Sequence, residues 1–216
     1  TDAFVINPST TLDGATDYLV FIDGGTFTDE AGNRFGAYPW YFKTDKYTQS
    51  IIFDSLANKT YGDDSFNLTA TASSELSVNY TSSNTDVATI SGNTVTITGA
   101  GTTTITASQA GNNEYYPADD VQQTLTVEKR TVNIAGSFTV DEKIYDGNTE
   151  ADISSNNLGL VNVVEGNTVN LNPVAAFIDK NVGENKEVDL TASSIDNNTD
   201  YSLSLDGAPT TTNDIT

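Results

Sequence analysis

The chain contains no cysteine and no histidine among its 216 residues. The absence of cysteine excludes disulfide bonds, zinc-thiolate sites and cysteine nucleophiles, so packing and hydrogen bonds alone must stabilise the fold. The absence of histidine removes the commonest general base and the commonest metal ligand, and it excludes a Ser-His-Asp triad. We therefore predict that this protein is not an enzyme.

Basic residues are scarce as well, because 9 Lys and Arg stand against 30 Asp and Glu, for a net charge of −21. The acidic excess is spread along the chain, which argues against nucleic acid and anionic membranes as partners. Long apolar runs are also missing, and no segment approaches the roughly 18 apolar residues of a membrane span. We expect no membrane insertion, and an acidic surface that keeps long arrays of domains soluble.

What the chain has in abundance is β-strand patterning, which is clearest in residues 86–108. Val95 and Ile97 alternate with threonines, and Ile105 and Ala107 do the same, so each segment has one apolar and one hydroxylated face. Glycine-containing turns separate these segments. A sheet with one apolar face must pack on a second sheet. The pattern predicts an all-β fold of small β-sandwiches with little or no helix.

Length and turn spacing favour several small sandwiches, since each needs roughly 80–100 residues. We predict three segments, residues 1–45, 46–129 and 130–216. The junctions around residues 45 and 129 are too short to act as flexible linkers. Tandem domains arranged end to end are therefore expected.

Residues 1–45 are predicted to hold strands at 4–6, 17–22 and 38–43. They resemble the second half of the Ig-like domain of bacterial surface-layer and adhesin proteins, through Ile6-Asn7-Pro8, Leu12, Asp17-Tyr18, residues 27–33 (FTDEAGN) and residues 40–44 (WYFKT). The first half of such a domain is missing. A half sandwich leaves apolar faces and open edges, so we expect this segment to dock on the next domain or to complete its sheet with a neighbouring chain.

Residues 46–129 are expected to form a complete sandwich, with strands at 66–72, 76–81 and 121–127 beside those of residues 86–108. This segment resembles the MBG-type and bacterial Ig-like repeats of large adhesins. The resemblance rests on Tyr61-Gly62-Asp63, Ser82-Ser83-Asn84, Asp86-Val87-Ala88, Gly99-Ala100-Gly101-Thr102, Ile105-Thr106-Ala107 and Thr124-Leu125-Thr126-Val127.

Residues 130–216 resemble the YDG repeat of giant bacterial surface proteins. The resemblance rests on residues 143–149 (KIYDGNT) and 177–183 (FIDKNVG). Asp200 stands where that repeat usually has an asparagine, ahead of Tyr201, which is a minor departure. Because such arrays run on into further repeats, we expect both ends of this chain to be cuts in a longer protein.

Adjacent carboxylates are the candidate metal ligands, since calcium takes six to eight oxygen atoms from carboxylates and carbonyls. Asp63 with Asp64, and Asp119 with Asp120, are the candidate calcium pairs, and Asp29 is a further candidate. The alternative interpretation is that all five are acids of surface turns, where an Asp side chain bonds its own backbone. Calcium is the one cofactor that the sequence suggests.

Aromatic residues are the candidate glycan ligands, because a flat ring face suits a sugar. Trp40 shares one side of its strand with Tyr38 and Phe42, so we expect it in a core. Tyr115 and Tyr116 lie in a Gly/Asn-rich loop and are the better candidates, although Tyr116 could also close the end of its own sandwich.

Two lesser features have structural and chemical interpretations. Tyr145-Asp146-Gly147 is expected to be a turn anchored by its tyrosine. Lys59, Lys143 and Lys180 lie near Asn or Asp in the sequence and are candidates for an intramolecular Lys-Asn isopeptide bond.

The resemblances imply a non-enzymatic structural or adhesive segment of a long secreted bacterial cell-surface protein, a rod-like stalk that presents a distal binding region. The expected partners are neighbouring Ig-like domains of the same or an adjacent chain, and host or environmental glycans. Two alternatives stay open. One is a subunit of an extracellular filament completed by strands from a neighbouring chain, and the other is a glycan-binding accessory module of a secreted enzyme.

Overall fold

The structure is a computed structural model of the whole chain. It describes residues 8, 10–22, 28, 30–34 and 36–216. All regular structure in these residues is β, as the sequence predicts. Over the same ranges no helix has the length and apolar character needed to cross a membrane. The chain divides into a first unit of residues 1–54, 69–81 and 106–122, and a second unit of residues 55–68, 82–105 and 123–216.

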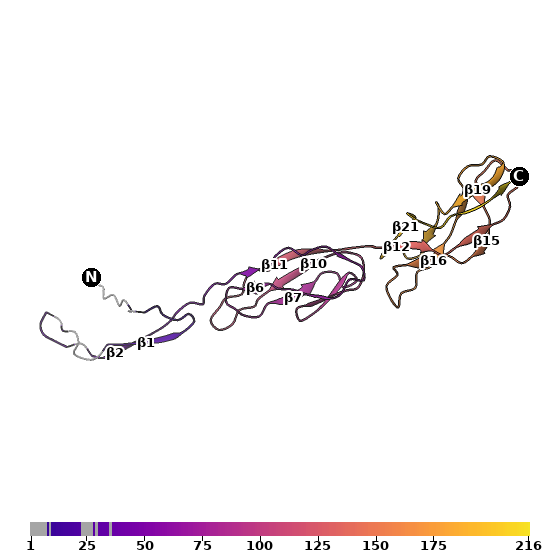
Figure 1. The fold of residues 1–216 in the computed structure, drawn as a ribbon. Helices are drawn as coiled ribbons and strands as arrows, with labels where there is room; N and C mark the ends of the chain where they lie inside the picture. Colours follow the sequence, from indigo (N-terminus) through magenta and orange to yellow (C-terminus); the bar gives the residue numbers. More distant parts are fainter. Residues whose placement is uncertain (1–7, 9, 23–27, 29, 35) are drawn as a thin grey trace. The chain divides into compact units, whose positions relative to one another are not determined.

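The first unit contains two short antiparallel pairs. Strands β1 (Asp17–Ile22) and β2 (Tyr38–Lys43) form a hairpin with the bounds that the sequence predicts (Figure 1). The strand expected at residues 4–6 lies outside the described residues. Strands β3 (Ile51–Ile52) and β6 (Thr71–Ala72) form the second pair. Buried side chains of Ile51 and Ala72 show that this pair contributes to a core.

The segment of residues 46–129 contributes strands to both units. One sheet has the order β4-β11-β10-β7, and another has the order β5-β9-β8. Their bounds are β4 (Lys59–Thr60), β5 (Phe66–Asn67), β7 (Asn79–Ser82), β8 (Ala88–Ser91), β9 (Thr94–Ile97), β10 (Gly101–Ser108) and β11 (Val121–Glu128). Val95, Ile105 and Ala107 are fully buried, which confirms the apolar face predicted from alternation.

One predicted strand of this segment is interrupted. The sequence predicts a continuous strand from Phe66 to Ala72, whereas the structure has β5 and β6 with a break between them. Strand β5 pairs with β9, and β6 pairs with β3. Between the two strands the Leu68 amide donates to the carbonyl of Asn93. The chain therefore changes pairing partner at this point, a change that an alternating pattern does not reveal.

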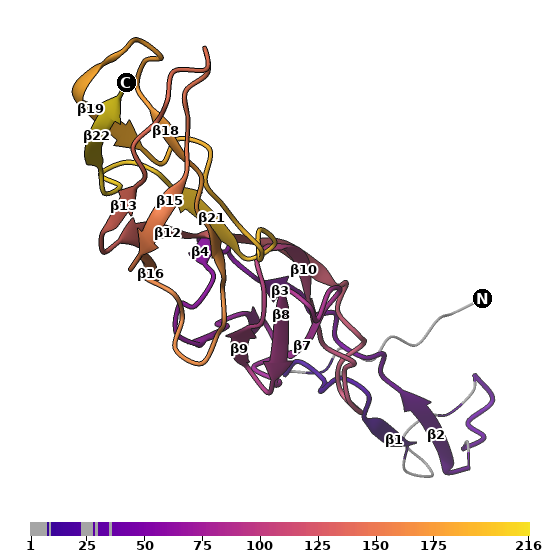
Figure 2. The same cartoon turned by 90° about the vertical axis from the view of Figure 1, so that its right-hand side faces the viewer.

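Residues 130–216 lie in the second unit and hold eleven strands (Figure 2). The strands are β12 (Arg130–Ala135), β13 (Phe138–Val140), β14 (Glu150–Ala151), β15 (Ile153–Asn156), β16 (Gly159–Val161), β17 (Leu171–Asn172), β18 (Ala175–Phe177), β19 (Gly183–Asp189), β20 (Ser194–Ile195), β21 (Tyr201–Ser204) and β22 (Thr211–Ile215). The larger sheets have the orders β16-β12-β21 and β14-β18-β19-β22, with two further pairs, β13-β15 and β17-β20.

Two buried clusters stabilise residues 130–216. The larger cluster takes side chains from β12, β13, β18, β19 and β22, including Phe177 and Val188, so it joins the two larger sheets. The smaller cluster is built around Val132, Ile195 and Tyr201. Tyr201 is fully buried, and it is the largest side chain in that condition. Packing between sheets is the arrangement expected of a β-sandwich.

Candidate functional site

A connected group of polar and aromatic residues surrounds Tyr61, in the turn that follows β4. The Tyr61 and Tyr201 rings meet edge to face at 90°, with centroids 5.4 Å apart. Asn167 donates from Nδ2 to the hydroxyl oxygens of both tyrosines, each at 2.8 Å. The Val164 amide also donates to the Tyr201 hydroxyl, at 3.2 Å. We call Tyr61, Arg130, Val164, Asn167 and Tyr201 the tyrosine joint.

Backbone hydrogen bonds hold the chain in place on both sides of this joint. The Tyr61 amide donates to the carbonyl of Glu128 at 2.9 Å, at the end of β11. Arg130 begins β12, so only Lys129 separates the two strands. The Arg130 guanidinium donates to the carbonyl oxygens of Asn162 and Tyr61, at 2.7 and 3.4 Å. The tyrosine joint therefore links the β4 turn to residues 130–216 directly.

Gly62 allows the close approach at the joint. Its φ of +86° lies in the region that L side chains rarely adopt, and an added Cβ would lie 2.4 Å from Cγ2 of Val164. Only glycine meets both conditions without strain. Asp63 closes the same turn, because its carboxylate accepts from the Thr60 amide at 2.9 Å.

Asp200 makes a second connection within this unit. Its backbone carbonyl accepts from the Arg130 amide, and its side-chain Oδ1 accepts from the amide of Ala100 at 2.9 Å. A hydrogen bond to a carboxylate is stronger than one to a neutral amide oxygen. Aspartate in place of asparagine at position 200 therefore strengthens this hydrogen bond, which joins two residues 100 positions apart in the chain.

The two YDG-like signatures form polar turns. Lys143 donates to Asp146 at 2.8 Å and to Asn148 at 2.9 Å. This hydrogen bond from Lys143, together with one from the Asn148 amide, lowers the pKa of Asp146. In the second signature Asp179 accepts from Lys186 of β19, and this hydrogen bond lowers the pKa of the Asp179 carboxyl. Each signature thus carries an aspartate paired with a nearby lysine.

Residues 128–212 match the family model of the YDG domain. This match confirms the YDG resemblance for that part of the chain. The comparison with curated proteins returned no match. In the YDG domain the first signature, residues 143–149, pairs with the last strand, since Lys143 forms a parallel bridge with Ile215.

The candidate calcium ligands do not form a preassembled site in the structure. Asp63 already accepts the Thr60 amide, and Asp64, Asp119 and Asp120 are exposed. Asp29 lies outside the described residues. Over the part of the chain that the structure describes, no group of three or more His, Cys, Asp or Glu side chains could hold a metal ion. Calcium binding at these acids stays a prediction.

The candidate glycan ligands Tyr115 and Tyr116 are tied to the segment that follows the hairpin. Tyr47 forms a parallel bridge with Tyr115, and their ring centroids are 5.7 Å apart. Tyr115 is half-buried, while Tyr116 is exposed and donates its hydroxyl proton to Asp45. This hydrogen bond raises the pKa of Tyr116 and lowers that of Asp45. The glycan role stays a prediction, and Tyr116 is the more accessible of the two.

An open polar pocket of about 470 Å³ adjoins Tyr116. Its lining includes Lys43 at the end of β2, Lys46 and the Asp45 carboxylate. Lys46 also lies over the Tyr116 ring, with Nζ 5.9 Å from the centroid. Lys46 therefore covers part of one face of the Tyr116 ring, so less of that ring is left for a sugar.

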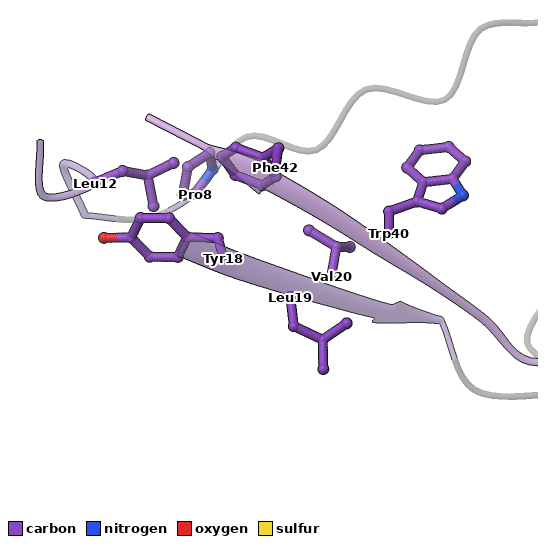
Figure 3. A pocket seen from close by; sticks show the side chains of 7 residues that line it. All are labelled: Pro8, Leu12, Tyr18, Leu19, Val20, Trp40 and Phe42. Atoms are coloured by element: carbon purple, nitrogen blue, oxygen red, sulfur yellow. The ribbon is translucent and has the colours of Figure 1, made fainter. Parts of the chain in front are cut away.

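The β1–β2 hairpin differs most from expectation. On one face Tyr18 stacks on Phe42 with centroids 5.5 Å apart, and Val20 lies opposite Trp40. These side chains, with Pro8, Leu12 and Leu19, line an open pocket of about 310 Å³ (Figure 3). Trp40 is 55% exposed, so the prediction that it lies in a core was wrong. A two-stranded sheet is too small to cover its own aromatic side chains.

The three candidate lysines of an isopeptide bond are in different environments. Lys143 donates both to the Asp146 carboxylate and to the side-chain oxygen of Asn148. Lys59 lies over the Phe66 ring, with Nζ 4.8 Å from the centroid, and Lys180 is exposed. The isopeptide bond stays a prediction, with Lys143-Asn148 its nearest pair.

Sequence reasoning missed the role of Val164 and Asn167 altogether. Asn167 lies in a loop more than 100 residues from Tyr61, and its neighbours Glu165 and Gly166 give only a turn signal. Tyr61 was singled out, but only as part of a resemblance. The sequence shows only two separate features, the turn tyrosine Tyr61 and the Asp-Tyr dipeptide at residues 200–201. No local pattern indicates that the two lie together.

Proposed function

We propose that this protein is a non-enzymatic structural and adhesive segment of a long, secreted bacterial cell-surface protein. Tandem Ig-like β-sandwich modules would act as a rod-like stalk that presents a distal binding region outside the cell. The tyrosine joint is the observation that carries this proposal. A flexible linker would let neighbouring modules swing, whereas a stalk needs modules that hold a fixed angle.

Several features of the joint support this reading. Strand β11 ends at Glu128 and β12 begins at Arg130, so no slack chain lies between them. The aromatic contact, the Asn167 amide and the Asp200 carboxylate then stabilise the same junction. Each contact is modest alone, but together they would restrain the junction. The net charge of −21 would keep such stalks apart from one another.

Small-angle X-ray scattering of the full chain, with light scattering in the same buffer, tests the stalk. The proposal predicts a monomer whose pair-distance distribution has the long tail of an elongated particle. Adding the Tyr61→Ala and Asn167→Ala changes should shorten and broaden that tail, because the joint then bends. A compact particle, or a distribution unchanged by the two substitutions, would contradict the proposal.

The hairpin favours a second candidate function, a filament subunit completed by a neighbouring chain. Phe21 and Tyr41 are 60% and 77% exposed, and Leu19, which is 54% exposed, also borders the pocket of Figure 3. Large exposed apolar faces mark interaction surfaces. Concentration-dependent assembly in light scattering, abolished by Leu19→Ser with Phe21→Ser, would favour the filament. A monomer at every concentration would contradict the filament, and the stalk would then be the proposed function that remains.

A further inference from the structure

The YDG domain contains a second copy of the Tyr61 turn, and we infer that this copy docks another module. The copy is centred on Tyr145, with Ile144 beside it. Its occupant is a second copy of the YDG-type module, covering Tyr145 as residues 129–216 cover Tyr61. This inference rests on the proposed stalk and names the surface by which it extends.

The backbone hydrogen bonds establish the equivalence of the two turns. Lys59 and Lys143 each stand two residues before their tyrosine, and each pairs in parallel with the last strand of its own segment. The partner of Lys59 is Val127, and the partner of Lys143 is Ile215. The Tyr61 amide donates to the carbonyl of Glu128 at 2.9 Å, and the Tyr145 amide donates to that of Thr216 at 2.8 Å. Thr216 therefore corresponds to Glu128.

Each tyrosine is followed by a glycine with a positive φ, but the two glycines stand at different positions and in different surroundings. Gly62 directly follows Tyr61 and has a φ of +86°, whereas Gly147 is the second residue after Tyr145 and has a φ of +85°. A Cβ on Gly62 would collide with Val164, whereas a Cβ on Gly147 would meet nothing within 4 Å. The space beside the glycine is thus filled in the turn at residues 61–63 and open in the turn at residues 145–147.

The side chains follow the same contrast. Tyr61 and Thr60 are half-buried, and Tyr61 has its ring against Tyr201 and its hydroxyl held by Asn167. Tyr145 is 52% exposed, and Ile144, the counterpart of Thr60, is 81% exposed. Two large exposed side chains beside one another form an apolar surface, which another module would remove from water by packing on it.

Register and charge both identify the occupant. After Glu128 the chain continues with Lys129 and Arg130, and Arg130 donates to the Tyr61 carbonyl. If a second copy of residues 129–216 followed Thr216, its first lysine and arginine would take the places that Lys129 and Arg130 have after Glu128. The copy's counterparts of Val164, Asn167 and Tyr201 would then lie at Tyr145. The pocket beside Ile144 is acidic on balance, because its lining holds one lysine, Lys143, against five acids, Asp141, Glu142, Asp146, Glu150 and Asp152. Two basic residues entering next to it would therefore be favoured electrostatically.

The test uses the full chain and an extended chain in which residues 129–216 are repeated directly after Thr216. Thermal unfolding is compared for Tyr145→Ala in both chains. We expect this substitution to lower the melting temperature by about 4–8 °C more in the extended chain than in the original one. Tyr145→Phe, which removes only the hydroxyl, should give a smaller loss confined to the extended chain. Val182→Ala, a change at a site 62% exposed, is the matched control.

Equal effects of Tyr145→Ala in the two chains would overturn the inference, since Tyr145 then makes no contact with the added module. The Tyr61→Ala change in the original chain separates this result from failure of the stalk itself. If Tyr61→Ala destabilises the original chain while Tyr145→Ala has equal effects in the original and the extended chain, the tyrosine joint is supported and the docking surface at Tyr145 is refuted.

Discussion

Truncating Tyr61 to alanine is the perturbation that follows most directly from the tyrosine joint. The substitution removes the ring that meets Tyr201 edge to face and the hydroxyl that accepts from Asn167. An aromatic pair of this kind contributes about 0.5–1.5 kcal/mol beyond the area it buries. A hydrogen bond between neutral groups contributes about 0.5–1.5 kcal/mol.

The expected total is a loss of about 2–3 kcal/mol in the free energy of unfolding, once the partial burial of the ring is included. The value stays moderate because Asn167 keeps its second hydrogen bond, to the Tyr201 hydroxyl, and is not left unpaired. Tyr61→Phe retains the ring and should cost about 1 kcal/mol.

Urea unfolding followed by circular dichroism measures these losses, with a double-mutant cycle as the sharper readout. Combining Tyr61→Phe with Asn167→Ala should give a coupling energy of about 0.5–1.5 kcal/mol, because both substitutions remove the same hydrogen bond. Additivity of the two substitutions to within about 0.3 kcal/mol would refute the reasoning. The joint would then be a contact without energetic weight.

Two further predictions concern the turns and the acids. Gly62→Ala should lower the free energy of unfolding by about 2–3 kcal/mol, because a positive φ is combined with a collision with Val164. Gly92→Ala is the control, since Gly92 has a φ of +62° and open space around it, and it should cost about 1 kcal/mol. Equal losses for the two substitutions in urea unfolding would contradict the collision. The hydrogen bonds that Asp196 accepts from the Asn170 backbone and side chain lower its pKa. A lowered pKa stabilises the fold above the unfolded value of about 3.9, and this contribution is lost as the pH falls through the folded value. Asp196→Asn should therefore flatten the fall in melting temperature below about pH 4, and a fall as steep as that of the unaltered chain would contradict this role of Asp196.

Strand positions were largely predictable because alternation reports directly on burial. Strands β1 and β2 have the predicted bounds, and β11 extends the predicted strand by one residue, to Glu128. The break between β5 and β6 was not predictable, because a change of pairing partner leaves the alternation of side chains intact. Trp40 was predicted to be buried because its strand has the pattern of a core, but a pattern does not show whether a covering sheet is present.

The tyrosine joint was beyond prediction for a related reason. A side chain such as Asn167 is an ordinary loop residue until folding brings two distant tyrosines to it. The internal equivalence of Tyr61 and Tyr145 was partly visible as a repeated Lys-x-Tyr spacing ahead of a glycine. Only the shared pairing with a last strand shows that the two positions correspond.

The stiffness of the junction between Glu128 and Arg130 is the central claim, and a spin-label distance measurement tests it most directly. The cysteine-free chain allows labels at two introduced cysteines, Thr89→Cys on β8 and Ser155→Cys on β15, both exposed. The account predicts a narrow distance distribution by double electron-electron resonance, which broadens when Tyr61→Ala and Asn167→Ala are added. A broad distribution in the otherwise unaltered chain would contradict the account, because its modules would then move independently.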